Sequence, residues 1–157
     1  METRIKVTAL SYADVLNLCK KVMESQTAFS LECSMEKYKR CCFPQQSDTF
    51  EDALAKCLFF AKGGIVAWDV NSNNNNQYYG HLQHKWDGMV MCYRLRLNNV
   101  REGIENALNG NFGNSRGLKD AARAAVYHLA ENGAKDFTYM DAHILMQIII
   151  FGEVVYL

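Results

Sequence analysis

The segment from Tyr78 to Asp87 (YYGHLQHKWD) is rich in side chains that could do chemistry. His81 and His84 are three residues apart and Asp87 follows, so a helix or turn here could offer two imidazoles and a carboxylate to zinc. A second pair of ligands is missing, because the adjacent Cys41-Cys42 lacks the spacing of a zinc knuckle and no HExxH motif occurs. The sequence therefore predicts no metal and no other cofactor.

The same segment suits contact with a protein partner. Exposed aromatic side chains concentrate at the energetic centres of protein interfaces. We expect the contact residues to be Tyr78, Tyr79, His81, His84 and Trp86. The alternative is that Trp86 and Tyr79 only cover the edge of the core.

Basic residues could gather on one face of a sheet. In the predicted strand from Gly88 to Leu97, side-chain alternation places Arg94 and Arg96 on the face opposite Met91 and Tyr93. If this strand shares a sheet with a first strand at the N-terminus, the open face carries Arg4, Lys6, Arg94 and Arg96, beside Trp68. Such a face could bind the phosphates of a nucleic acid or nucleotide. The alternative is an ordinary solvated face, since the formal net charge is zero and no RNA-binding signature occurs.

A cysteine nucleophile is a third possibility. Cys92 lies near arginines in the sequence, and four histidines could serve as a base. The chain has neither a GxSxG motif nor a cysteine-protease signature, so a metal-dependent or Cys-His hydrolase ranks third among the functions considered. Asp69 and Asp87 could also approach each other across a hairpin, but no motif fixes their separation.

A glycine-rich segment, Asn109 to Gly117 (NGNFGNSRG), leads into a helix at Ser115 with Arg116 beside it. A helix N-terminus can hold an anion. The spacing matches neither the P-loop nor the dinucleotide fingerprint, so the segment is better interpreted as a loop with a good helix cap.

The elements that must position these residues follow from periodicity and capping signals. Strands are predicted at Arg4–Leu10, at Ile65–Val70, around Tyr78-Tyr79 and at Gly88–Leu97. The stretch from Ile65 to Leu97 is expected to form a hairpin or meander, with the turn-forming residues Asn71–Asn76 within it. Helices are predicted from Ser11 to Glu24, after the cap Thr49, after Asn98 or Asn99, from Ser115 to about Asn132, and from Thr138, with a short helical turn at Met35–Arg40 in an otherwise irregular, packed segment.

The last of these helices is predicted to be buried. Thr138 and Asp141 have capping-box spacing, and the residues from Ile144 to Phe151 are apolar around nearly the whole circumference. His143 and Gln147 form a narrow polar stripe that we interpret as satisfied core groups. The predicted fold is α+β, with a small antiparallel sheet of three to four strands packed by about five helices.

Length and composition set further limits. A chain of 157 residues is most simply a single domain, residues 1–157. The first residues are too polar for a signal peptide and no stretch is apolar enough to span a membrane, so a cytoplasmic location with reduced cysteines is expected.

The opening KVTALSYADVLNLCKKV and the closing DAHILMQIIIFGEVVY resemble small uncharacterised proteins carried by phages and mobile elements of gut bacteria. These stretches carry no motif with known chemistry and imply no residue roles. The resemblance implies an accessory protein that binds and blocks a host factor, including a component of antiviral defence.

The sequence thus favours a non-enzymatic binding protein with a protein partner and no membrane association. A nucleic-acid or nucleotide-binding module is the alternative. The sequence predicts neither the identity of the partner nor the oligomeric state.

Overall fold

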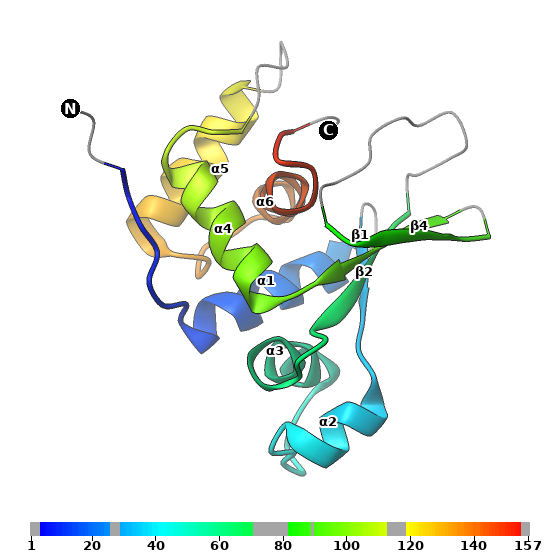
Figure 1. Ribbon diagram of the computed structural model, residues 1–157. Helices are drawn as coiled ribbons and strands as arrows, with labels where there is room; N and C mark the ends of the chain where they lie inside the picture. Colours follow the sequence, from blue (N-terminus) through cyan, green and yellow to red (C-terminus); the bar gives the residue numbers. More distant parts are fainter. Residues whose placement is uncertain (1–3, 26–28, 71–81, 89, 113–118, 155–157) are drawn as a thin grey trace.

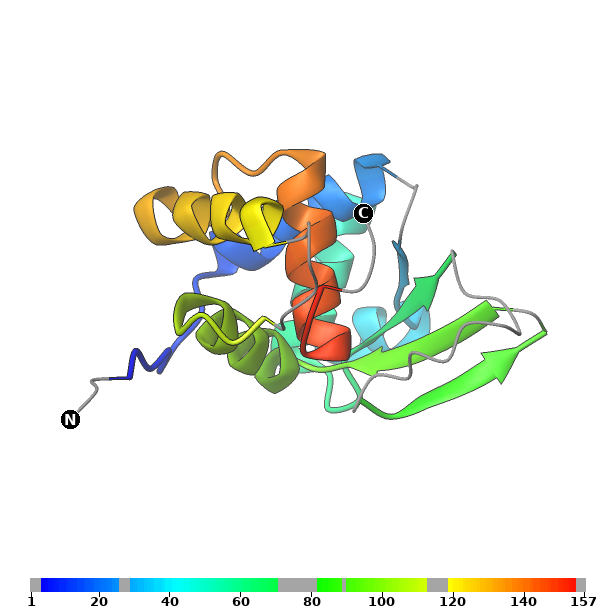
Figure 2. The same ribbon diagram turned by 90° about the horizontal axis from the view of Figure 1, so that it is seen from above.

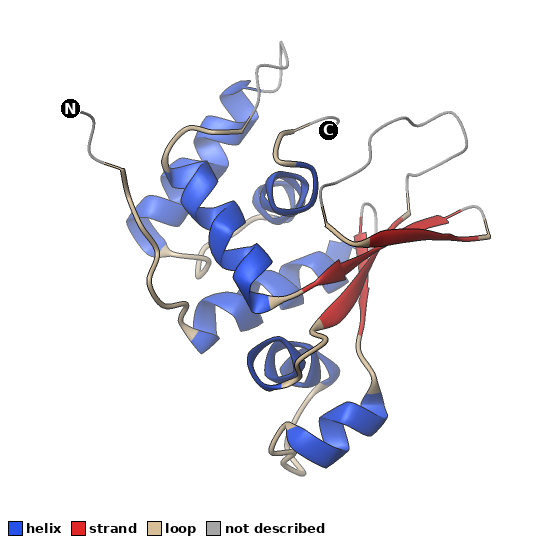
Figure 3. Cartoon of the chain, viewed as in Figure 1, coloured by secondary structure: helices blue, strands red, loops and turns tan. Residues whose placement is uncertain are grey.

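The computed structural model describes residues 4–25, 29–70, 82–88, 90–112 and 119–154 (Figure 1). In this part of the chain, an antiparallel sheet of four strands lies beside six helices (Figure 3). The predicted α+β class with a small antiparallel sheet is confirmed. None of the described helices is both long and apolar enough to cross a membrane.

The helices begin largely where the capping signals place them. Ser11 Oγ accepts a hydrogen bond from the Asp14 backbone N–H at 3.4 Å, and Thr49 and Thr138 each form a capping box with the aspartate three residues on. The helices are α1 (Tyr12–Ser25), α2 (Met35–Cys41), α3 (Phe50–Phe60), α4 (Leu97–Leu108), α5 (Lys119–Asn132) and α6 (Tyr139–Phe151).

The C-terminal helix α6 lies at the centre of the core, as predicted. Every residue from Ile144 to Ile150 is buried, and α6 contacts α1, α4 and α5. A Cβ atom at Gly103 of α4 would lie only 2.4 Å from Ile149 Cγ1, so α4 and α6 approach too closely for a side chain there. At the end of α6, the Phe151 ring lies 5.8 Å from the Tyr93 ring and joins the helix to the sheet.

The polar stripe of α6 is also confirmed as part of the core. Gln147 is fully buried, and its Nε2 lies 3.1 Å from His143 Nε2. Burial lowers the pKa of His143, which favours the neutral imidazole. The two side chains therefore contact each other within the core, while the prediction that every polar atom of the pair is satisfied is not confirmed for His143 Nδ1.

The sheet has the strand order β1-β2-β4-β3, with every neighbouring pair antiparallel. Its strands are β1 (Phe29–Glu32), β2 (Ile65–Asp69), β3 (His84–Asp87) and β4 (Val90–Leu95). One face carries buried side chains, among them Phe29, Ile65 and Tyr93, which pack towards α6 and the other helices. Within the predicted hairpin or meander from Ile65 to Leu97, the strands β3 and β4 form the hairpin. The strand β2 pairs with the other edge of β4.

The predicted first strand, Arg4–Leu10, is wrong. Its backbone bonds to side chains of α4 and of the C-cap residue Asn109 instead of to a strand: Ile5 N donates to Asn109 Oδ1 at 2.9 Å, and Asn109 Nδ2 donates to Ile5 O at 2.8 Å. Val7 N likewise donates to Glu105 Oε2 at 3.4 Å. The alternating pattern reflects an extended segment that lies along a helix, on the side of the molecule away from the sheet (Figure 2).

Two further predictions need correction. The strand β1 (Phe29–Glu32) occupies a stretch that was expected to be irregular, whereas the predicted helical turn that follows is present as α2. Helix α4 begins before the predicted caps Asn98 and Asn99, because Arg96 is its N-cap residue and the Asn99 side chain accepts from Arg96 N at 2.8 Å. The predictions for Asn71–Asn76, Tyr78-Tyr79 and Ser115 lie outside the described residues.

Candidate functional site

The strand β3 is an exposed edge of the sheet. All four of its side chains are exposed, and within the described residues no strand pairs with its outer side. Trp86 is 38% exposed. His84 is held by a 2.8 Å contact between its Nδ1 and Leu82 O, and its ring lies 5.8 Å from the Tyr93 ring.

Of the five predicted partner-contact residues, His84 and Trp86 therefore lie together on this edge strand. Tyr78, Tyr79 and His81 lie outside the described residues.

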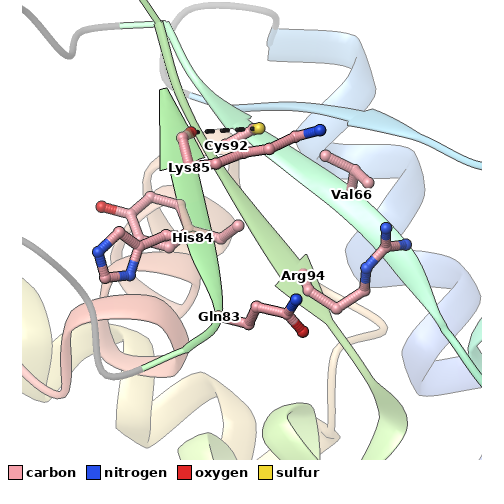
Figure 4. Close-up of a pocket in the computed structure, with 7 residues that line it drawn as sticks. Val66, Gln83, His84, Lys85, Cys92 and Arg94 are labelled. Carbon is pink, nitrogen blue, oxygen red and sulfur yellow. Dashed lines mark hydrogen bonds between the residues drawn. The ribbon is translucent and has the colours of Figure 1, made fainter. Parts of the chain in front are cut away.

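The open face of the sheet holds a small basic pocket. It has a volume of about 140 Å³ and is lined by Val66, Gln83, His84, Lys85, Cys92, Tyr93 and Arg94. Figure 4 shows Lys85 and Arg94 reaching from β3 and β4 towards Val66 of β2, while His84 points away from them. Arg94 Nη1 donates to Gly63 O at 3.3 Å, which fixes one side of the guanidinium.

The four predicted basic residues do not form one face. Arg94 lies on the open face as predicted, and Arg96 follows the strand as the exposed N-cap of α4. Arg4 and Lys6 belong to the segment along α4 and not to the sheet. The second basic residue that lines the pocket with Arg94 is Lys85, which the sequence pattern did not single out.

Within the described residues, Cys92 and the neighbouring His84 are not arranged as a nucleophile and its base. Its thiol is 4% exposed and donates to Lys85 O at 3.4 Å. In the strand register Cys92 is opposite Lys85, and alternation places His84 on the other face. This geometry gives the third function, a Cys-His hydrolase, no support.

The carboxylates of Asp69 and Asp87 are likewise not a pair. Asp69 is opposite Met91 on the buried face, whereas Asp87 is opposite Val90 on the open face. Among the residues that the structure describes, no group of three His, Cys, Asp or Glu side chains could hold a metal ion.

A polar cluster that sequence reasoning missed lies between α2 and α3. Asp48 accepts hydrogen bonds from Lys56 Nζ at 2.6 Å, from Gln45 N at 3.0 Å and from Tyr38 Oη. The Lys56 and Tyr38 donors lower the pKa of the Asp48 carboxyl to about 2, and the bond to Asp48 raises the pKa of Tyr38 to about 12. Lys56 also donates to Phe43 O at 3.1 Å, so the cluster fixes the loop between the helices.

Two buried cysteines lie close to each other near this loop. Cys42 Sγ lies 3.9 Å from Cys57 Sγ, and both thiols are free. Burial raises the pKa of Cys42 to about 12 and that of Cys57 to about 11. Both side chains are therefore protonated at neutral pH and serve as small apolar groups rather than as nucleophiles.

Comparison of the chain with protein-family models, with curated proteins and with solved structures gave no match. The function must therefore be inferred from the exposed edge strand and the basic pocket themselves.

Proposed function

We propose that the protein is a non-enzymatic binding protein whose partner is another protein, and that β3 (His84–Asp87) is the contact element. The observation that carries this proposal is the exposure of the whole edge strand, with Trp86 38% exposed. A free sheet edge offers main-chain donors and acceptors to an extended segment of a partner. An exposed tryptophan adds a large contact area that loses little conformational entropy on binding.

The charges of β3 influence which strands can pair with its free edge. Lys85 and Asp87 alternate with His84 and Trp86 along the strand. Charged side chains on an edge strand discourage pairing with strands that carry no matching charges. A partner strand with complementary charges would overcome this barrier, so charge contributes to selectivity while Trp86 contributes affinity.

The proposed mechanism is occlusion. The sheet is anchored through Tyr93 and Phe151 to the buried helix α6, so β3 is presented by a rigid domain. A rigid element that occupies a partner's binding site blocks it without any chemical step. The resemblance of the two ends of the chain to phage and mobile-element proteins makes a bacterial host factor the first class of partner to test.

The test is capture from a bacterial lysate by immobilised protein, comparing wild type with Trp86→Ser and with Tyr127→Ser. Tyr127 is the matched control, because it is an aromatic residue 63% exposed on α5, outside the sheet. We expect a protein that wild type and Tyr127→Ser retain and that Trp86→Ser loses. Retention should change little between about 0.05 and 0.5 M salt, because an aromatic contact is not screened as charge pairs are.

Equal capture by all three proteins would contradict the proposal, as would loss with Tyr127→Ser alone. A sharp decline of retention with salt would show that the basic face, and not Trp86, carries the contact.

A further inference from the structure

Three basic side chains converge on the open face from different elements: Lys37 from α2, Lys85 from β3 and Arg94 from β4. A Cβ atom built on Gly63 would lie 3.3 Å from Lys37 Nζ and 4.0 Å from Arg94 Nη1, so both cationic groups lie close to this glycine. Lys85 and Arg94 line the same pocket (Figure 4). Arg94 therefore has Lys37 near it at Gly63 and Lys85 near it in the pocket.

None of these cations forms an ion pair in the described part of the chain, although Asp87 lies on the same face of β3 as Lys85. The ion pairs found there involve other basic residues, namely Lys21, Arg40, Lys56, Arg101, Arg123 and His128. Glu32 is separated from Arg94 by Val66 of β2 in the strand register, and its Oε2 accepts from Trp68 Nε1 at 3.0 Å. Like charges gathered without an anion repel one another, and a bound anion would relieve this repulsion.

The guanidinium of Arg94 is already positioned. Its Nη1 donates to Gly63 O at 3.3 Å, which leaves the other N–H groups for a ligand. A guanidinium held in place can donate two parallel hydrogen bonds to one oxyanion, and the lysines add mobile point charges around it.

The size of the pocket limits the ligand. Its volume of about 140 Å³ is well below the roughly 300–1,000 Å³ of sites that enclose drug-sized molecules. The site can therefore take one small anionic group, while the rest of a larger ligand lies on the open face.

We propose that Lys37, Lys85 and Arg94 form a binding site for the phosphate group of a small phosphorylated molecule. Three positive charges match a phosphomonoester, which carries about −1.5 to −2 charges at pH 7, better than they match a carboxylate with a single charge. This site shares Lys85 with the contact strand β3, but Trp86, the residue proposed to supply the affinity of the partner contact, lies on the other face of that strand by alternation.

The experiment is a titration of ¹⁵N-labelled protein with inorganic phosphate, adenosine 5′-monophosphate and succinate, at constant ionic strength. We expect the backbone signals of Gly63, Lys85 and Arg94 to shift with phosphate, with a Kd of about 1 mM. Arg94→Gln should weaken binding about tenfold, because a charge-assisted hydrogen-bond donor is lost. Lys39→Gln is the matched control: Lys39 is an exposed α2 lysine and should bind phosphate as wild type does.

The source of the phosphate group follows from the same titration. If adenosine 5′-monophosphate binds more tightly than inorganic phosphate, the ligand is a nucleotide whose base contacts the open face; equal affinity assigns the site to the phosphate group alone. Unshifted signals at Gly63 and Arg94 would overturn the proposal, as would equal binding by wild type and Arg94→Gln. Succinate binding as tightly as phosphate would overturn the choice of a phosphomonoester. Because none of these variants changes Trp86, failure here leaves the partner proposal standing.

Discussion

Lys56 and Lys37 come from neighbouring helices, α3 and α2, but their surroundings differ. Lys56 Nζ lies 2.6 Å from Asp48 Oδ2, and the side chains of this pair are only 14% and 10% exposed. Lys37 is exposed and near Arg94, and within the described residues no carboxylate forms an ion pair with it. The comparison separates cations that stabilise the fold, which have a carboxylate partner, from cations that are available to a ligand.

This distinction has a physical basis. A buried charge without a partner is strongly destabilising, so a cation in the interior requires a nearby carboxylate. On a solvated face water satisfies the charge, and a partner is optional. The buried acidic residue of α6 obeys the same rule, because Asp141 Oδ2 lies 2.6 Å from His128 Nδ1 and also accepts from Thr138 N at 3.0 Å.

The largest expected effect comes from a carboxylate placed in the core without such partners. Ile148 of α6 is 1% exposed, so Ile148→Asp buries a charge among apolar groups. The penalty of several kcal/mol is comparable with a total stability of about 5–15 kcal/mol. We expect no soluble folded protein, as measured by soluble yield and far-ultraviolet circular dichroism. Ile148→Leu is the control and should fold, because its volume is conserved; a well-folded Ile148→Asp would refute the buried-helix interpretation.

The position of this helix is also what sequence reasoning predicted best. The capping boxes of Thr49 and Thr138 involve residues three apart, so a local signal suffices to place a helix start. The segment Arg4–Leu10 shows the opposite case, because its alternation is equally compatible with a strand and with an extended segment bonded to Asn109. The four-residue strand β1 (Phe29–Glu32) was missed because so short a stretch gives no clear period.

The residues of the candidate sites also divide into those that a local signal placed and those that only the fold brings together. Alternation along β4 correctly placed Arg94 on the open face, since it depends only on the strand itself. Lys37 and Arg94 both approach Gly63, and Lys85 lines the same pocket as Arg94; no spacing in the sequence records either of these proximities. The Asp48–Lys56 pair was missed because Asp48 lies just before the N-cap Thr49, where the chain is not yet helical, so the spacing of residues in α3 does not place its side chain beside Lys56.

A moderate effect is expected from breaking the paired cation. Lys56→Met leaves Asp48 without its cationic donor, and we expect the Tm at pH 7 to fall by about 5 °C. Thermal unfolding followed by circular dichroism measures this change. Lys39→Met, at an exposed lysine of α2, is the matched control and should keep the wild-type Tm; an equal fall in both variants would show that the pair does not stabilise the fold.

The same variant has a predicted pH dependence. The pKa of Asp48 is lowered to about 2 in the folded protein, below its ordinary value of 3.8. The stabilisation from Asp48 is therefore complete above pH 3.8 and is lost as the pH falls towards 2. We expect the Tm difference between wild type and Lys56→Met to shrink over this interval, and a difference that stays constant would contradict the assignment of the pair to Asp48.

The smallest effect is expected from removing cations that form no ion pair with any described residue. Arg94 donates one side-chain hydrogen bond to Gly63 O and is only partly buried, while Arg96 is exposed. The double substitution Arg94→Ala with Arg96→Ala should therefore change the Tm by no more than about 2 °C, as substitutions on a solvated face usually do. A fall as large as that of Lys56→Met would show that the guanidinium of Arg94 serves the fold. An unchanged Tm together with lost phosphate binding would instead show that a positive charge held on the open face without a carboxylate partner acts on a ligand.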